Sequence, residues 1–118
     1  MIVNIDKYDC SIKDIVYKVT CKLCFQFYIG ETYREAHDRF SEHRRAANSP
    51  STYPDEALAD HYNNFHSKSK ADLSFEILET RLSGTVRRKI REAYYIYNLK
   101  PEINNKEECK LLERYLVK

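Results

Sequence analysis

The sequence contains no long hydrophobic run and no secretory leader. No stretch approaches the roughly 20 apolar residues that a membrane-spanning helix needs. The N-terminal segment MIVNIDKYDC lacks the charged start and the apolar run of a signal peptide. The sequence thus lacks the features typical of membrane-spanning and secreted proteins. We expect a protein that works inside a cell, without a membrane partner.

A large excess of one charge is also absent. The 118 residues include 20 Lys and Arg and 18 Asp and Glu, a formal net charge of +2. Charge alone therefore does not identify a nucleic-acid-binding protein. The composition, 42% hydrophobic and 32% charged, is typical of a soluble globular protein, and the length fits one domain with a modest core. We predict an N-terminal extension over residues 1–14 and a single domain over residues 15–118.

Cysteine is scarce, with four in the chain. Without a secretory leader, they favour metal binding or free thiols over a disulfide framework. Cys21 and Cys24 have C-x2-C spacing, and His61 and His66 form an H-x4-H pair downstream. The two remaining cysteines, expected to be unligated thiols, are Cys10 and Cys109.

Residues 15–20 and 25–30 are rich in β-branched and aromatic residues, which predicts a β-hairpin. The Lys-Leu pair at its turn is a poor choice for a tight bend, which normally takes Asn-Gly or a similar pair. If these two residues form the loop, Tyr17 lies opposite Tyr28 as a cross-strand pair. Both phenols would then lie on one face of the sheet.

A structural zinc ion would hold such a bend. We predict that Cys21 and Cys24 bind Zn²⁺ together with His61 and His66, a closed set of four ligands. The 36 residues between the two pairs are far more than the roughly 12 of a small zinc finger, so the ion would tie the hairpin to a second helix. That helix is predicted to begin near residue 55, with His61 in its last turn and His66 just beyond. Buried thiols and a surface histidine pair are the alternative.

The first helix is predicted after the hairpin. Thr32 and Glu35 have the spacing of a capping box, which places the helix start at Tyr33. The predicted buried stripe consists of Ala36, Phe40 and Ala47.

Arg39 and His43 lie one turn apart on the packing side of this helix. They point toward the hairpin face that carries Tyr17 and Tyr28. Basic runs of this kind are typical either of a solvated helix face or of a phosphate-binding groove, and closeness to the tyrosines favours the groove. The basic residues of this helix and of a later one are Arg34, Arg39, Arg44, Arg45, Arg87, Arg88, Lys89 and Arg91.

The remaining pattern predicts a third strand over residues 73–80, a helix over 85–99 and a last amphipathic helix over 107–117. The fold class is α/β (α+β), with a small, mainly antiparallel three-stranded sheet flanked by helices. The expected buried stripe of the 85–99 helix is Val86, Ile90, Ala93 and Tyr97.

Glu92 lies outside that stripe, on a second flank with Ile96 and Leu99. A carboxylate on a partly apolar flank is costly unless it is paired or bound to a cation. A pair with Arg88 or a plain surface position is the alternative to a metal ligand.

A resemblance follows from the order of these pieces. Ile15-Val16-Tyr17, then Tyr28-Ile29-Gly30, then Arg39 and His43 resemble the signature of the GIY-YIG endonucleases. Ile15 stands where that motif has its first glycine.

The resemblance extends over roughly residues 15–104. Glu92 and Asn104, which follows Pro101, take the places of the family's metal-binding glutamate and late asparagine. The added C-x2-C and H-x4-H pairs look most like the endonuclease domain of Penelope-like retroelements.

The resemblance implies a set of roles. Glu92 would bind Mg²⁺ (or Mn²⁺), and Arg39 would hold the charged phosphate. Tyr17 would be the general base with His43 as its partner or proton acceptor, although the sequence leaves the base open between the two. Tyr28 would shape the pocket, and Asn104 would orient its neighbours. The predicted DNA-binding residues are Gly30, Arg34, Arg44, Arg45, Arg88 and Lys89.

The expected function is therefore a metal-dependent DNA endonuclease that nicks DNA. In a Penelope-like element it would open target DNA for reverse transcription, in the nucleus, beside a reverse transcriptase or another targeting domain. A zinc-stabilised nucleic-acid-binding module without catalysis is the first alternative. A structure-specific repair nuclease of the same fold is the second.

Overall fold

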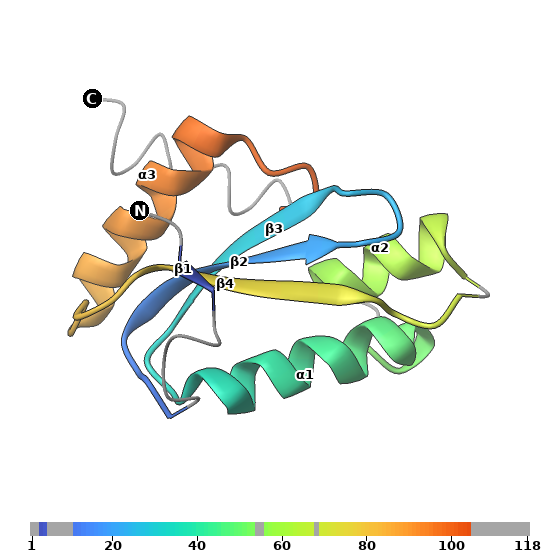
Figure 1. Cartoon of the computed structure of the whole chain (residues 1–118), viewed down its shortest axis with the longest axis horizontal. Coiled ribbons are helices and arrows are strands. Elements are labelled where there is room, and N and C mark those ends of the chain that lie inside the picture. The colour runs from blue at the N-terminus through green and yellow to red at the C-terminus, as the bar shows by residue number, and fades with distance from the viewer. Residues whose placement is uncertain (1–2, 5–10, 54–55, 68, 105–118) are drawn as a thin grey trace.

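A computed structural model describes residues 3–4, 11–53, 56–67 and 69–104 (Figure 1). It contains one antiparallel sheet with strand order β1-β4-β2-β3. The strands are β1 (Val3–Asn4), β2 (Ile15–Cys21), β3 (Phe27–Thr32) and β4 (Leu73–Glu79). The helices are α1 (Ala36–Asn48), the 3-10 turn η2 (Pro50–Thr52), α2 (Ala57–Phe65) and α3 (Thr85–Leu99).

The predicted α+β class and its three main strands are confirmed. The two-residue β1 is an addition, because it pairs with β4 from within the segment predicted as an extension. The predicted last helix, Cys10 and Cys109 lie outside the described residues. No helix in the described part of the chain has both the length and the apolar character needed to cross a bilayer.

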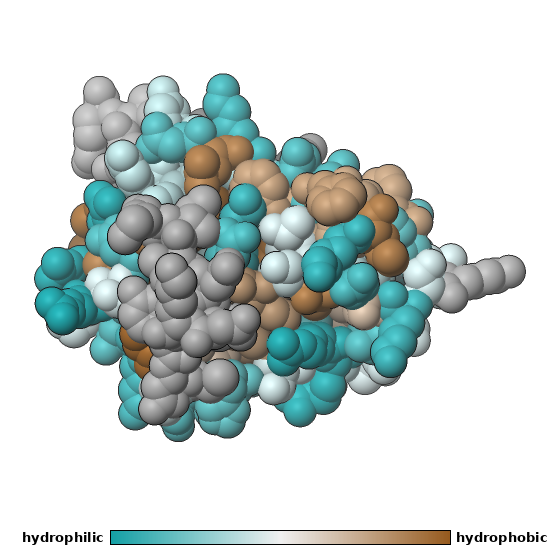
Figure 2. Space-filling view, viewed as in Figure 1, coloured by the Kyte–Doolittle hydropathy of each residue, from teal (hydrophilic) through white to brown (hydrophobic). Residues whose placement is uncertain are grey.

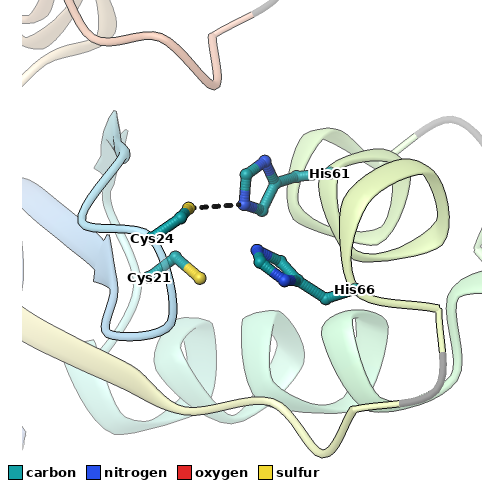
Figure 3. Close-up of side chains that lie close together, drawn as sticks. All are labelled: Cys21, Cys24, His61 and His66. Carbon is teal, nitrogen blue, oxygen red and sulfur yellow. Dashed lines mark hydrogen bonds between the residues drawn. The ribbon is translucent and has the colours of Figure 1, made fainter.

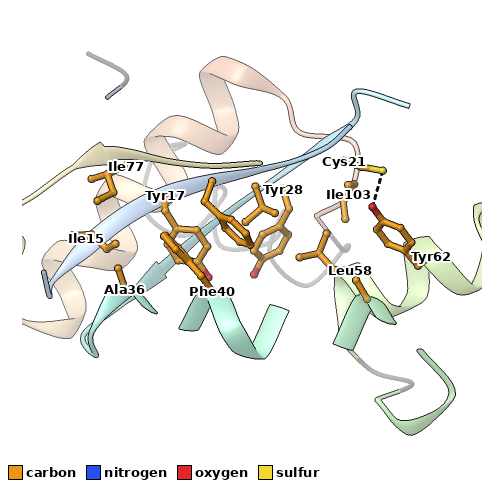
Figure 4. Close-up of a cluster of buried hydrophobic side chains, with 13 residues drawn as sticks. Ile15, Tyr17, Cys21, Tyr28, Ala36, Phe40, Leu58, Tyr62, Ile77 and Ile103 are labelled. Carbon is orange, nitrogen blue, oxygen red and sulfur yellow. Dashed lines mark hydrogen bonds between the residues drawn. The ribbon is translucent and has the colours of Figure 1, made fainter. Parts of the chain in front are cut away.

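Helices cover both faces of the sheet. On β2, Tyr17 and Val19 join the core formed with α1 and α2, and Val16 joins a second core with Ile96 of α3. The alternation of a strand sends successive side chains to opposite faces, so a central strand buried on both sides is apolar along most of its length. Figure 4 shows the larger cluster between the sheet and α1, with Tyr17, Phe40 and Tyr28 at its centre.

The hairpin register differs from the predicted one by two residues. Tyr17 pairs with Gly30, and Val19 pairs with Tyr28, so the direct Tyr17–Tyr28 pair was wrong. The loop is longer than two residues, since Phe25 takes a left-handed conformation (φ 65°) and the Cys21 amide donates to the Gln26 carbonyl. A slip of two preserves the side-chain face. Both phenols therefore share one face, with ring centroids 6.5 Å apart.

The start of α1 was also mispredicted. The helix begins at Ala36, and Glu35 at its N-cap makes no side-chain capping bond. Thr32 is instead the last residue of β3, and its hydroxyl accepts from the Arg34 amide. Strand pairing with Ile15 thus prevents the capping box. The predicted stripe of Ala36, Phe40 and Ala47 is buried, as is His43.

The bounds of α3 match the prediction, but of its predicted buried stripe only Ala93 is buried. Val86 is 62% exposed and Tyr97 is 56% exposed, whereas Arg88 and Glu92 are buried at 5% and 4%. Ion pairs allow this face to be buried, because carboxylates neutralise the Arg88 guanidinium. The hydrophobic pattern alone therefore pointed to the wrong side of the helix.

Candidate functional site

Tyr17 forms the centre of a buried polar site on the α1 side of the sheet. Its hydroxyl oxygen lies 2.7 Å from Nε2 of His43 and accepts a hydrogen bond from Nε of Arg39 at 3.2 Å. A guanidinium only donates, so the phenolic proton is directed at His43. His43 Nε2 must then be the acceptor, and the proton of the neutral ring lies on Nδ1.

Glu56, the residue before α2, accepts the hydrogen bond from the Nδ1–H group of His43. Its Oε1 lies 3.2 Å from Nδ1 of His43, while its Oε2 accepts from the Ala59 amide at 3.0 Å and caps the helix. Sequence analysis missed Glu56. Its position before a helix indicated a cap at most, and nothing local links it to a histidine in the preceding helix.

Burial decides the protonation states in this centre. Desolvation raises the pKa of Tyr17 well above its ordinary value, although the positive charge of Arg39 opposes the rise. Desolvation lowers the pKa of His43, although the hydrogen bond that its Nδ1–H group donates to Glu56 opposes this fall. At neutral pH the site therefore holds a protonated phenol and a neutral imidazole. Tyr17 can act as a base only if its proton moves to His43.

Gly30 and Tyr28 shape the space around the phenol. A Cβ atom at Gly30 would lie 2.6 Å from the Tyr17 hydroxyl and 2.8 Å from the Tyr28 ring, so a side chain here would displace both rings. The Tyr28 ring meets His43 edge-on, with centroids 5.4 Å apart. Gly30, predicted to contact DNA, is thus required for packing inside the site.

Glu92 is buried on α3, as expected for a carboxylate with a role beyond the surface. Its Oε1 lies 3.8 Å from Nζ of Lys89, which also pairs with Glu31 at 3.0 Å. Burial is the main cause of the raised pKa of Tyr17, and the negative charge of Glu92 adds to the rise. Glu92 is neither a surface acid nor, in any described ion pair, a partner of Arg88.

Arg88 is buried and paired with groups of the protein itself. Its buried guanidinium donates to Glu31 at 2.8 Å, to Asp14 at 2.9 Å and to the Leu82 carbonyl at 3.4 Å. Lys89 is held by the same Glu31. Arg88 therefore links α3 to Glu31 of β3 and to Asp14, and its predicted contact with DNA stays a prediction.

The basic residues of α1 and of the segment just before it are more accessible. Arg34, which precedes the helix, makes two hydrogen bonds to Glu42, at 2.6 and 2.8 Å, and Arg39 donates to the same carboxylate at 3.0 Å. Arg44 lies over the Phe75 ring, 4.5 Å from its centroid. A cavity of about 260 Å³ opens between α1 and the start of α2. Its lining residues are Arg39, Glu42, Arg45, Ala46, Tyr53 and Glu56.

Asn104 orients the backbone of β3. Its Oδ1 accepts from the Ile29 amide at 2.9 Å, and its Nδ2 donates to the Ile29 carbonyl at 2.8 Å. The adjacent Ile103 amide donates to the Phe27 carbonyl at 3.1 Å. This short segment satisfies the outer edge of β3, next to Tyr28 and Gly30, which is the orienting role expected of Asn104.

The second polar cluster joins the hairpin to α2 (Figure 3). One ligand atom from each of Cys21, Cys24, His61 and His66 lies within 4.8 Å of all the others. Sγ of Cys24 is 3.4 Å from Nε2 of His61. His66 follows α2 directly, as predicted, because the helix ends at Phe65.

These residues fit a zinc ion. Zinc bonds of about 2.0–2.3 Å place the atoms of a tetrahedral set about 3.3–3.8 Å apart, close to the observed grouping. Nε2 of His66 is buried without a hydrogen-bond partner among the described residues, an arrangement that costs free energy unless a ligand satisfies it. Two thiols and two imidazoles are the donors that zinc prefers.

The surface around this cluster is unusually apolar. Figure 2 shows a mostly hydrophilic face on which apolar side chains gather near the hairpin end. Phe25 in the loop is 74% exposed and Phe65 at the end of α2 is 71% exposed. The Phe65 ring lies 5.4 Å from the His61 ring, so it shields one side of the cluster from water.

Comparison of the chain with protein-family models, with curated proteins and with solved structures gave no match. The chemistry of the site must therefore be argued from its own geometry. Two arrangements stand out: four soft ligands around a common point, and a proton path from a buried phenol through an imidazole to a carboxylate.

Proposed function

We propose that the chain is a metal-dependent endonuclease that hydrolyses phosphodiester bonds in DNA and nicks one strand. The observation that carries the proposal is the hydrogen-bonded series Arg39, Tyr17, His43 and Glu56, together with the buried carboxylate of Glu92 on α3, whose negative charge acts on Tyr17. A cation, an acid–base pair and a metal-binding oxygen are the groups that phosphodiester hydrolysis requires.

The residues divide the proton transfer between them. Water gives a proton to the Tyr17 oxygen while the phenolic proton passes to Nε2 of His43. The water oxygen forms a bond to phosphorus, and the bond from phosphorus to the leaving deoxyribose oxygen breaks. That oxygen takes up a proton from solvent, and the extra proton on His43 is released afterwards, which returns the site to its starting state. Arg39 donates to the Tyr17 oxygen and so stabilises negative charge on it. The exposed part of its guanidinium faces the adjoining cavity, through which a phosphate would approach.

Glu92 would hold the catalytic ion. A buried glutamate supplies the hard oxygen donor that Mg²⁺ or Mn²⁺ prefers, and the ion would bind the phosphate and stabilise the leaving oxygen. The cluster of two cysteines and two histidines would hold a structural Zn²⁺. It keeps no place for a substrate, because four protein ligands complete a tetrahedron.

The resemblance to Penelope-like endonuclease domains supports a narrower proposal. The nick would open target DNA for reverse transcription, in a nucleus, and a reverse transcriptase or another targeting domain would select the site. The Cys/His cluster is the feature that favours this subclass.

The test is relaxation of supercoiled plasmid in Mg²⁺, at several salt concentrations, by the wild type and by Glu92→Gln. The amide keeps the size of the side chain but removes the anionic ligand, so cleavage should be lost while DNA binding persists. Glu76→Ala, on β4, is the control and should cut normally. Equal cleavage by Glu92→Gln would remove Glu92 from the mechanism. An inactive wild type with salt-sensitive DNA binding would support the binding module instead.

A further inference from the structure

His43 is enclosed by groups from four elements. It is fully buried, and its ring meets Tyr17 of β2 and Tyr28 of β3 at centroid distances of 5.6 and 5.4 Å. The charged groups that act on it are Arg39 and Glu42 from its own helix and Glu56 from the start of α2. Of these, the one hydrogen-bonded to the ring among the described residues is Glu56.

We infer that Glu56 is a positioning residue, which holds His43 in the Nδ1–H tautomer and so aims the Nε2 lone pair at the Tyr17 hydroxyl. A carboxylate only accepts, so the bond at 3.2 Å requires a proton on Nδ1. Nε2, 2.7 Å from the Tyr17 oxygen, is then left as the acceptor. The catalytic consequence rests on the proposed nuclease function, whereas the tautomer itself does not.

The proton balance shows what Glu56 contributes. When the Tyr17 proton moves to Nε2, the ring becomes an imidazolium that carries one proton on each nitrogen. That cation forms in a fully buried position, where an unpaired charge is costly. Glu56 faces the Nδ1–H side and offsets this charge, while Arg39 on the other side stabilises the phenolate. The tautomer and the charge balance both depend on one carboxylate.

The second bond of Glu56 supplies a matched control. Its Oε2 caps α2 through the Ala59 amide, and serine is also a strong N-cap residue. Glu56→Ser should therefore retain the helix cap but is too short to reach His43. Glu56→Gln retains an oxygen that can accept from Nδ1 but lacks the negative charge.

Three proteins should be compared in plasmid cleavage across pH: the wild type, Glu56→Ser and Glu56→Gln. Loss of the carboxylate should lower kcat of Glu56→Ser by about 10²–10⁴-fold with little change in KM, as for other acids that orient a catalytic histidine. Glu56→Gln should recover at least part of this loss. Glu56 raises the pKa of His43 and so opposes the effect of burial. The pKa of His43 should therefore fall in Glu56→Gln, and the acid limb of the plot of kcat against pH should move to lower pH. Wild-type kcat and an unmoved limb in Glu56→Ser would overturn the inference.

A readout independent of cleavage separates this inference from the proposed function. Nitrogen NMR of the His43 ring should show the Nδ1–H tautomer in the wild type and Glu56→Gln, and its loss in Glu56→Ser. If the tautomer is unchanged in Glu56→Ser, Glu56 does not position His43, whatever the activity. If the tautomer depends on Glu56 but no variant cuts DNA, the positioning role stands and the nuclease proposal fails.

Discussion

Two polar clusters, the one around Tyr17 and the Cys/His cluster, lie in the same layer of this molecule. They differ in how completely their polar atoms find hydrogen-bond partners within the protein. Around Tyr17, the hydroxyl, both nitrogens of His43 and both oxygens of Glu56 have partners within the chain. In the Cys/His cluster, four donor atoms face a common point, and Nε2 of His66 is buried without a partner among the described residues.

The difference indicates what each cluster needs. A buried polar atom without a partner costs about 1–3 kcal/mol, and an ion bound by the Cys/His cluster would remove that cost. The Tyr17 centre is satisfied by the protein alone and is therefore ordered before any substrate arrives. Helix α2 connects them, since Glu56 precedes it, His61 lies within it and His66 follows it.

Removal of one of the four predicted zinc ligands should have the largest effect on stability. His66→Ala should lose bound zinc and unfold at a markedly lower temperature, because an ion present at 1,000 times its Kd stabilises the native state by about 4 kcal/mol. Elemental analysis gives the zinc content, and thermal unfolding followed by circular dichroism gives the stability.

His37→Ala is the matched control, since His37 is exposed on α1 and pairs with Asp38. It should retain zinc and wild-type stability. A wild type that contains no zinc, and that is no more stable than His66→Ala, would contradict a metal centre and leave the cluster as buried thiols beside a histidine pair.

The same substitution made in each cluster sharpens the comparison. Tyr17→Phe removes the hydroxyl between His43 and Arg39, so cleavage should fall by about 10²–10⁴-fold, the usual contribution of general acid–base catalysis. Tyr62→Phe removes a hydroxyl bonded to Cys21 Sγ and to the Asp72 amide, near the metal ligands.

Both variants should lose about 1–3 kcal/mol of stability, because each leaves a buried partner unpaired. Only Tyr17→Phe should lose activity under conditions in which both remain folded, measured by plasmid cleavage and urea unfolding. Equal activity of the two variants would place Tyr17 among the packing residues and outside the chemistry.

Sequence patterns predicted those features of the fold that depend on local spacing. The enrichment in β-branched and aromatic residues identified β2, and the spacing of the Cys and His pairs placed Cys21 and His61 in one cluster. The shared face of Tyr17 and Tyr28 was predicted correctly despite the wrong register, because a shift of two residues preserves the face.

Features that depend on tertiary partners were not predictable in this way. The buried face of α3 was missed because Arg88 is buried there. Its charge is neutralised by the carboxylates of Glu31 and Asp14, which are distant in sequence. Glu56 was missed for the same reason: its role depends on His43, on another helix. A polar residue becomes part of a site through its partners, and a hydrophobic pattern carries no information about them.

The smallest expected effect concerns Glu42, which ties Arg34 and Arg39 together at the solvent side of the Tyr17 centre. The pKa of this carboxyl is lowered from 4.5 to about 2, and the hydrogen bonds from Arg34 are the largest cause. Its stabilisation is therefore fully present above pH 4.5 and is lost as the pH falls toward 2. Since the pair is partly exposed, Glu42→Gln should cost no more than about 1 kcal/mol at neutral pH, and less in high salt.

Urea unfolding of the wild type and Glu42→Gln at pH 7 and near pH 1 tests this, with Glu76→Gln as a control for the loss of one negative charge. The two stabilities should converge only below pH 2, because Glu42 is then protonated in both the folded and the unfolded wild type. A difference that persists near pH 1 would mean that the contribution of Glu42 is packing and not charge. A loss of cleavage as large as that in Tyr17→Phe would mean that Glu42, too, belongs to the proton path, and that this path extends to the surface.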